Sequence, residues 1–516
     1  MTSSDKDTDS NYQSLLEKAK QVVVLETAQG IIHWDMETMM PPMGIRLRSE
    51  QLGLLSKIAH KMTTDAEIGE LLRKLQTGPD YPTFSSLQKR NLYLIKKNYD
   101  EQTKLPEDLV VQTAKQRAIA IDAWKKAKAA NKFSDFRPEL EKLVDLRKKA
   151  ANILMEVKET ATPYDALVDI FEPKMTAQTI SRVFNELRTG ILQIIRKCEY
   201  SHSDPDASVL RRKVNIETQR VISKTIADII GYDIHSKQAG GRIDETEHPF
   251  TTGYYPDVRV TTHYHEDKWA SSVFSVLHEI GHAVYNQNLP QDWIYQPVGD
   301  NCSLGFHESQ SRLFENIIGR SKEFWIYLLP RLKEITGQVL ADVSIDTIVR
   351  AINQVKGSKI RIEADEVTYC LHIIIRFEIE QQLFSNKIAV SELPEIWNEK
   401  YKEYLGVEVQ NDSEGVMQDT HWASGSFGYF PTYALGNIYS GQLLEKMDRD
   451  LPNWRQPVSK GDCNEIKNWL VNNVYRYGNL LDPSDLIKEI TGREITVEPY
   501  LRYLNRKFAQ LYEYDP

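Results

Sequence analysis

Residues 276–283 read VLHEIGHA, which places His278 and His282 four positions apart with Glu279 directly after the first histidine. Side chains four residues apart lie on the same face of an α-helix, so the two imidazoles can bind one ion together. Apolar residues recur through 269–284 near the 3.6-residue period, which predicts a buried helix around the pattern. H-E-x-x-H on such a helix indicates a divalent metal site in which Glu279 holds a water without binding the metal itself.

The alternative is that two of the 12 histidines fall at this spacing by chance, as ordinary core or surface residues. The helical context that the pattern requires favours the metal site. We expect one divalent ion per chain, with zinc as the first choice and cobalt or another divalent ion as the alternatives.

A catalytic zinc site needs a third protein ligand. The extended pattern, with a histidine six residues past the second one, is absent because that position is Asn288. A second predicted helix, from 303 to 316, offers His307, Glu308 and Glu315. The residues alone leave His307 and Glu308 almost equal, with Glu315 behind them. Glu308 could also form a helical ion pair with Arg312.

Further motifs follow the same order as in a known family: DVRVT at 257–261, HESQS at 307–311, IRIEAD at 360–365 and GVMQDTHW at 415–422. Together with H-E-I-G-H they resemble the carboxypeptidase Taq family of metallocarboxypeptidases, over nearly the whole length of the chain. The resemblance implies that Glu308 is the third ligand. It also implies a mostly helical fold with a deep central cleft, a homodimer, and broad tolerance for the C-terminal side chain.

The remaining sequence predicts a mostly α-helical protein. Helical patterns run from Tyr12 to about Lys197 and again from 321 to 408, and neither an internal repeat nor a low-complexity linker interrupts them. We therefore expect one domain over 1–516, with the active-site region at about 240–440. The β-branched run 257–264 predicts a strand just before the metal helix, and we expect it to line the substrate groove as an edge strand. The alternative is a small structural hairpin, which the residues alone favour equally.

Composition excludes several classes of function. The net charge of −9 and the lack of a polybasic cluster argue against nucleic acid as the main partner. No apolar run approaches the ~20 residues of a membrane span, and the N-terminal residues lack a signal-peptide pattern. Four scattered cysteines fit a reducing compartment. We expect a cytoplasmic protein that acts on peptides.

A carboxypeptidase must recognise a free carboxylate, which a guanidinium binds with two hydrogen bonds. The resemblance makes Arg361 the expected anchor, although an ion pair with Asp365 is the simpler explanation for this arginine. Arg259 is the second candidate, and Asp257 lies on the same side of the predicted strand, where the two can pair.

Glycine and aromatic residues alternate through 411–441, a composition typical of loops that shape a site. Similar helical zinc peptidases use a late histidine and tyrosine to bind the oxyanion. That likeness assigns the two roles to His421 and Tyr433, with Tyr429 as the next tyrosine.

The expected function is removal of C-terminal amino acids from peptides by metal-assisted hydrolysis, with Glu279 as general base. Two alternatives stand beside it. A zinc oligoendopeptidase would share the chemistry but lack a carboxylate anchor, and a catalytically idle peptide-binding scaffold would have no chemical reason to keep Glu279.

Overall fold

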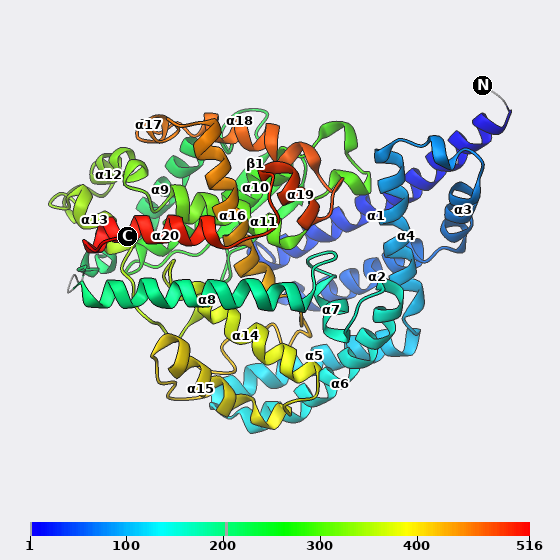
Figure 1. Cartoon of the computed structure of the whole chain (residues 1–516), viewed down its shortest axis with the longest axis horizontal. Coiled ribbons are helices and arrows are strands. Elements are labelled where there is room, and N and C mark those ends of the chain that lie inside the picture. Colours follow the sequence, from blue (N-terminus) through cyan, green and yellow to red (C-terminus); the bar gives the residue numbers. More distant parts are fainter. Residues whose placement is uncertain (1–2, 202–204) are drawn as a thin grey trace.

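The computed structural model describes residues 3–201 and 205–516. Helices dominate, and the strands of the described residues form one three-stranded sheet. The predicted fold class, mostly α with a small β element, is confirmed. In Figure 1 the long helix α8 runs lengthwise through the molecule, with α14 and α15 below it and α20 above it.

Among the described residues that precede the sheet, all regular secondary structure is helical. The α-helices are α1 (Ser3–Thr38), α2 (Ile45–Thr63), α3 (Ala66–Thr77), α4 (Ser86–Lys104), α5 (Glu107–Ala130), α6 (Phe133–Lys158), α7 (Pro163–Val168), α8 (Ala177–Tyr200) and α9 (Ile216–Ile230). Helices α1, α3 and α4 share a small apolar cluster that includes Leu15, Leu72 and Leu92.

The sheet follows α9 and consists of β1 (Gly241–Glu245), β2 (Thr251–Tyr254) and β3 (Asp257–Thr262) in the order β1-β3-β2. Strand β3 pairs with β1 in parallel and with β2 in antiparallel orientation. The prediction that β3 is an edge strand was wrong, because backbone neighbours take its hydrogen bonds on both sides. Period-2 alternation predicts a strand but carries no information about its place in the sheet.

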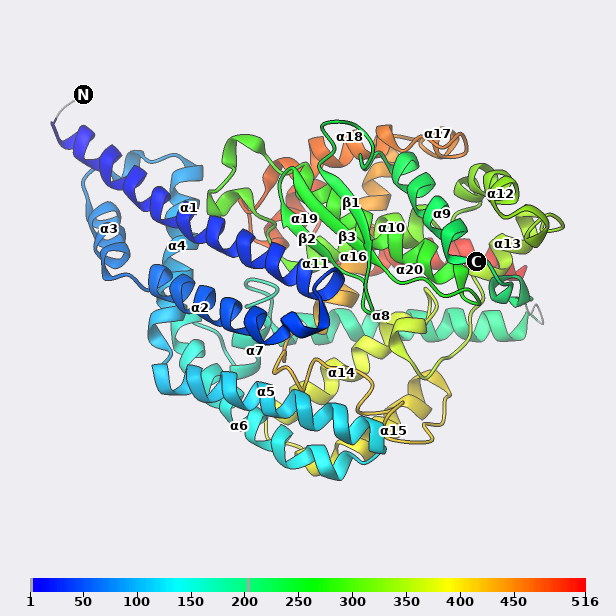
Figure 2. The same ribbon diagram turned by 180° about the vertical axis from the view of Figure 1, so that it is seen from behind.

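The two faces of the sheet have different neighbours. On one face, Val258 and Val260 are fully buried. On the same face, the Oγ1 atom of Thr262 lies 3.2 Å from the Oγ atom of Ser275, which belongs to the following helix, α10 (Trp269–Gln287). Arg259 alternates to the opposite face, where its guanidinium lies over the ring of Trp34 of α1. Figure 2 shows α1 and the sheet on the same side of the molecule.

The second half returns to helices. They are α11 (Leu304–Arg312), followed by a π-helical turn (Leu313–Ile318), and then α12 (Lys322–Thr336), α13 (Ile345–Ile352), α14 (Tyr369–Phe384), α15 (Leu393–Leu405), α16 (Pro431–Asp450), α17 (Arg455–Val458), α18 (Asn464–Asn473), α19 (Pro483–Thr491) and α20 (Glu498–Tyr512). One apolar core joins side chains from Ala120 to Tyr512 and contains α10 and α16.

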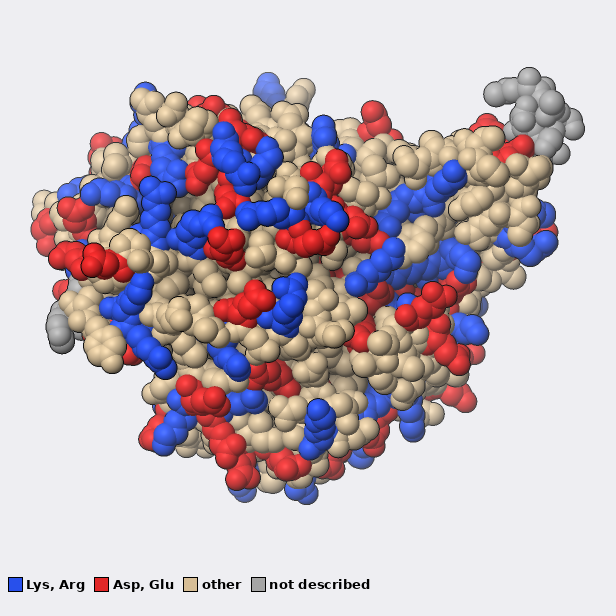
Figure 3. Space-filling model, viewed as in Figure 1, with Lys and Arg blue, Asp and Glu red and all other residues tan. Residues whose placement is uncertain are grey.

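The surface carries charges of both signs. In Figure 3 Lys and Arg are interleaved with Asp and Glu over the face that is shown. Within 3–201 and 205–516, none of the helices is both long and apolar enough to cross a bilayer. All four cysteines are buried and free.

Candidate metal centre

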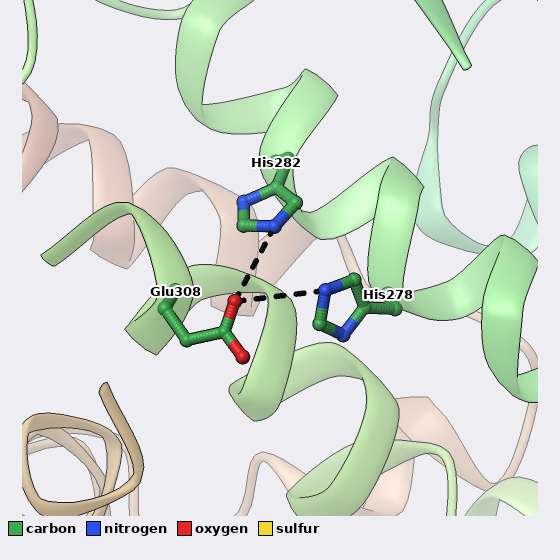
Figure 4. A group of neighbouring side chains, drawn as sticks. All are labelled: His278, His282 and Glu308. Atoms are coloured by element: carbon green, nitrogen blue, oxygen red, sulfur yellow. Dashed lines mark ion pairs between the residues drawn. The ribbon is translucent and has the colours of Figure 1, made fainter. Parts of the chain in front are cut away.

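The structure brings the three predicted metal ligands together on two helices. His278 and His282 project from α10, and Glu308 projects from α11 (Figure 4). The Oε2 atom of Glu308 lies 3.6 Å from the Nε2 atoms of both histidines. One donor atom from each residue lies within 4.8 Å of the other two. Two imidazole nitrogens and one carboxylate oxygen form the donor set of many catalytic zinc sites, so these residues fit a divalent metal ion.

Glu315 holds His278 from the other side of its ring. Its Oε2 lies 2.8 Å from the Nδ1 atom of His278, which leaves Nε2 facing Glu308. Arg312 donates to both carboxylates, at 2.6 Å to Glu308 and at 3.1 Å to Glu315. Such a carboxylate–histidine pair fixes the tautomer and the orientation of a metal-binding imidazole. The π-helical turn that contains Glu315 is a local feature often found at functional sites.

The carboxylates of Glu308 and Glu315 make the electrostatic potential at the site negative. Burial alone lowers the pKa of His278, but Glu308 and Glu315 outweigh burial and raise it to about 9. Burial raises the pKa of Glu315, but Arg312 and His278 outweigh it and lower this pKa to about 2. The field that favours a proton on the imidazole also favours a divalent cation in its place.

His307 takes a different position from its neighbour Glu308. Its Nε2 atom is 2.9 Å from Oδ1 of Asn286, and its ring stacks on that of His282 with 4.3 Å between centroids. Burial lowers the pKa of His307 to about 4, so the imidazole is neutral at neutral pH. The structure therefore leaves His307 outside the group of converging donor atoms.

Two glycines allow the helices to approach closely enough to form the group. A Cβ atom on Gly281 would lie 2.7 Å from the Gln310 carbonyl oxygen and the Ser311 Cα, both in the backbone of α11. A Cβ atom on Gly436 of α16 would lie 2.6 Å from Cγ of Glu308. Glycine at these positions lets α11 pack against α10 on one side and α16 on the other.

Replacing Gly436 with Ala is expected to weaken the binding of a divalent metal ion at least about tenfold, because the new methyl group displaces the Glu308 side chain that it overlaps. Overpacking at a buried contact also costs about 1–3 kcal/mol of stability. Competition with a chromogenic chelator measures the affinity, and thermal unfolding measures the stability.

Gly53→Ala is the matched control for this variant. Gly53 also lies within a helix, α2, and a Cβ atom there has nothing within 4 Å. Alanine should raise stability by about 0.5–1 kcal/mol at this position and leave metal binding unchanged. A Gly436→Ala variant with wild-type metal affinity would show that α16 does not constrain Glu308.

Glu279 is held beside the group by the sheet. It is 7% exposed, and Thr251 of β2 donates to its Oε2 at 2.6 Å. Burial raises the pKa of Glu279, while the His278 imidazole and the Thr251 hydroxyl oppose that rise. The side chain is thus fixed next to the donor atoms without being one of them.

His421 and Tyr433 lie side by side, with Nε2 of the histidine 3.2 Å from the phenol oxygen. The Tyr429 ring packs on Tyr433 with 5.3 Å between centroids. Burial raises the pKa of both phenols, and the Glu308 carboxylate adds to this rise. Tyr433 lies on the first turn of α16, so the prediction of a loop throughout 411–441 was wrong from Pro431 onward.

Arg361 lies in a short 3-10 turn, and the alternative of a helical ion pair with Asp365 was wrong. Its Nε and Nη2 atoms donate to Oδ1 of Asp419 at 3.0 and 2.8 Å, and Nη1 donates to Tyr369 at 3.2 Å. A guanidinium has five N–H groups, so within the described residues one N–H on each Nη atom remains for a ligand. The guanidinium lies 5.0 Å from the centroid of the Tyr433 ring.

Arg259 pairs with Asp257, as the predicted strand geometry allows. The Nε and Nη2 atoms both lie 2.9 Å from carboxylate oxygens of Asp257. Because the guanidinium faces Trp34 of α1, it points to the side of the sheet opposite Thr251 and Glu279.

Sequence reasoning missed Thr251, Arg312 and Asp419 as partners of the site. Arg312 appeared only as a competitor for Glu308, and it stabilises the carboxylate while Glu308 still faces the histidines. Asp419 lies within the GVMQDTHW motif, and a charged residue inside an aromatic, glycine-rich stretch is a signal that could have found it. Thr251 carries no such signal.

Comparison with known proteins gives a consistent result over the whole chain. The family model described as carboxypeptidase Taq (M32) metallopeptidase matches residues 14–508. Carboxypeptidase 1 of Bacillus subtilis is 40% identical over 497 residues, which cover 96% of this chain and 97% of that protein. Thermostable carboxypeptidase 1 of Thermus thermophilus is 37% identical over 508 residues, which cover 97% of this chain and 99% of that protein.

Solved structures agree with these matches. The M32 carboxypeptidase from Deinococcus radiodurans superposes with a TM-score of 0.93 at 33% identity, covering 98% of this chain and 100% of that one. Metallocarboxypeptidase 1 of Trypanosoma cruzi superposes with a TM-score of 0.92 at 32% identity, covering 97% of this chain and 99% of that one.

Proposed function

Because the chain belongs to the carboxypeptidase Taq (M32) family of metallopeptidases, we propose that its His278, His282 and Glu308 hold one zinc ion and that Glu279 is the general base. The protein is a metallocarboxypeptidase, a peptide hydrolase, and the alternative functions are not favoured. The observation that carries the assignment of residues is the convergence of three donor atoms beside a buried, hydrogen-bonded Glu279.

A divalent ion at these ligands supplies Lewis-acid polarisation of the scissile carbonyl and lowers the pKa of a water molecule. Glu279 accepts the proton of the attacking water and returns it to the leaving amine. The Thr251 hydrogen bond at 2.6 Å keeps the carboxylate turned toward the reacting atoms. Glu315 binds Nδ1 of His278 and so leaves Nε2 as the nitrogen that would bind the ion.

His421, Tyr433 and Tyr429 are the proposed donors to the oxyanion. Burial raises the pKa of both phenols, so they keep their protons at neutral pH. Burial also lowers the pKa of His421 to about 4, so this imidazole is neutral. Its Nδ1 atom is buried and has no partner among the described residues. A neutral imidazole carries one N–H group, so the His421–Tyr433 pair offers the oxyanion one proton: from Nδ1 of His421 when the phenol donates to Nε2, or from the phenol when Nε2–H donates to it. Each donor of this kind typically contributes about 10²–10³ in rate.

The peptide is proposed to lie along β2 instead of β3. No described strand pairs with the outer side of β2, and a free strand edge can bind an extended backbone. A cavity of about 610 Å³ lies between α1 and β2 and is lined by Thr252, Gly253 and Tyr254. Asn286 lines the same cavity and contacts His307, which stacks on His282, so the cavity adjoins the metal centre.

Arg361 is the proposed anchor for the terminal carboxylate, with Arg259 and its partner Asp257 as the alternative. The Arg361→Ala enzyme is expected to lose at least about tenfold in kcat/KM on peptides with a free C-terminus, because a charge-assisted pair is worth about 1.5–3 kcal/mol. Peptides with an amidated C-terminus never form this pair, so their slow cleavage should hardly change. Steady-state kinetics on matched acid and amide peptides provide the measurement.

Arg259→Ala supplies the comparison, since it removes the other candidate guanidinium. Equal slowing of both peptides by Arg361→Ala would reduce Arg361 to a structural partner of Asp419. A loss of the acid preference in Arg259→Ala alone would move the anchor to the face of the sheet near α1.

The remaining assignments are also proposals. Broad tolerance for the C-terminal side chain and assembly as a homodimer rest on the family resemblance, and zinc as the bound metal rests on the H-E-x-x-H pattern. The cytoplasmic location rests on the four scattered cysteines, and one domain over 1–516 rests on the lack of an internal repeat or a low-complexity linker. The apolar core that joins Ala120 to Tyr512 supports one domain over that part of the chain, while α1, α3 and α4 share a cluster of their own. Elemental analysis and light scattering of the purified protein test the metal and the dimer.

A further inference from the structure

Helix α14 holds the irregular segment 419–430, which carries His421 and Tyr429. Arg376 of α14 is fully buried, and its Nε donates to Oδ2 of Asp419 at 2.7 Å, at the start of the segment. One helical turn later, Glu380 is also fully buried and faces the same segment. The contacts of Glu380 distinguish it from an ordinary core residue.

The Glu380 carboxylate accepts hydrogen bonds from two separate points of the segment. The indole nitrogen of Trp422 donates to Oε1 at 2.8 Å, and the backbone nitrogen of Gly428 donates to Oε2 at 2.9 Å. Trp422 directly follows His421, and Gly428 directly precedes Tyr429. A single carboxylate thus fixes the chain beside each of two proposed oxyanion donors.

The backbone at position 428 requires glycine. Its φ of +82° lies in the left-handed region that favours glycine, and a Cβ atom would lie 2.7 Å from the backbone of Leu167. The phenol of Tyr164 on α7 supplies a third hydrogen bond, at 2.9 Å to Oε2. The contact is therefore built from three donors that converge on one side chain.

Burying a carboxylate in the core of a protein carries a large desolvation penalty. Removing the charge from water raises the pKa of Glu380 to about 7, and three hydrogen bonds and the nearby Arg376 oppose that rise only in part. An apolar side chain would fill this space without the desolvation penalty. The hydrogen bonds that Glu380 accepts from Trp422 and Gly428 explain why a carboxylate occupies this position.

We infer that Glu380 is a positioning residue for peptide hydrolysis, which sets His421 and Tyr429 in place through Trp422 and Gly428. The inference rests on the proposed roles of His421 and Tyr429. Because those roles concern the transition state, misplacement of the two donors should lower kcat more than it raises KM.

Glu380→Gln is the decisive variant, since glutamine has the same shape but turns an N–H group toward one of the donors. We expect kcat to fall at least about tenfold with KM within about twofold, because small displacements of catalytic groups are costly. Zinc content should equal that of the wild type. Amide hydrogen exchange should accelerate within 420–430.

Tyr164→Phe is the matched control. It removes one hydrogen bond from the same carboxylate, but the lost donor belongs to α7 and not to the segment. We expect kcat within about twofold of wild type and unchanged exchange in 420–430. If Glu380→Gln does not fold, Trp422→Phe replaces it, because it removes the indole donor and keeps an aromatic ring against Trp397.

Wild-type kcat or unchanged exchange in Glu380→Gln, or in its replacement, would overturn the inference. His421→Ala, measured alongside, separates this result from a failure of the proposed function. If His421→Ala is inactive while Glu380→Gln is fully active, only the positioning role is wrong. If His421→Ala is fully active, the oxyanion role is wrong, and the role of Glu380 in catalysis falls with it.

Discussion

Glu279→Gln is expected to abolish peptide hydrolysis and to leave the metal bound. Glutamine keeps the shape of the side chain and can still accept the Thr251 hydrogen bond, but it cannot take a proton from water. Loss of a general base typically costs about 10²–10⁴ in rate, so kcat should fall at least into this range. The three donor atoms of His278, His282 and Glu308 are untouched by the change.

Two measurements decide this prediction together. Peptide hydrolysis gives the activity, and elemental analysis after dialysis gives the metal content, with His278→Ala as the reference for a broken site. Activity within about tenfold of wild type would show that Glu279 is not the base. Metal loss as severe as that of His278→Ala would show instead that Glu279 takes part in binding.

The helix around His278 could be predicted from the sequence because its determinants are local. Four-residue spacing and a 3.6-residue apolar period both lie within 269–284, and the structure forms α10 over Trp269–Gln287 with its apolar face buried. The helical class of the whole chain follows from the same kind of local pattern, repeated along most of its length.

The partners of the site depend instead on contacts between distant segments. Asp419 is 58 residues from Arg361 and 43 residues from Arg376 in the sequence. Neither ion pair therefore produces a periodic pattern in the sequence that could predict it. Asp365 is four residues from Arg361 and was the natural partner on a helix, but a 3-10 turn takes the place of that helix. The Asp365 carboxylate instead accepts hydrogen bonds from the backbone nitrogens of Val367 and Thr368.

Glycines inside helices α10 and α16 carry information about helix contacts. Gly436 lies in α16, one turn after Tyr433. Glycine lowers the stability of a helix, so its presence there is best explained by a close contact that excludes a larger side chain. The structure supplies this contact in the side chain of Glu308. Gly281, inside the H-E-I-G-H motif, has the same explanation in the backbone of α11. Glycine therefore marks the point where a neighbouring helix crosses at Gly281 and Gly436, whereas Gly53 of α2, with open space around it, does not.

Glu308→Ala is expected to remove the metal, whereas His307→Ala is expected to retain it. Adjacent helical residues point about 100° apart, so only one of the two can face the histidines of α10. Glu308 does so, at 3.6 Å from both Nε2 atoms, while His307 stacks on the side of His282. Zinc content after dialysis against a weak chelator measures the difference.

Glu315→Ala is the informative third variant, because it removes a carboxylate of the same network that is not a proposed ligand. Its loss should weaken zinc binding about 10–100-fold, as expected for a partner that orients an imidazole. Glu308→Ala should bind far more weakly, since it removes a ligand and also takes away one of the two carboxylates paired with Arg312. If His307→Ala lost the metal while Glu308→Ala kept it, α11 would have to be rotated by one residue, and the contact between Gly436 and Glu308 would have to belong to a different side chain.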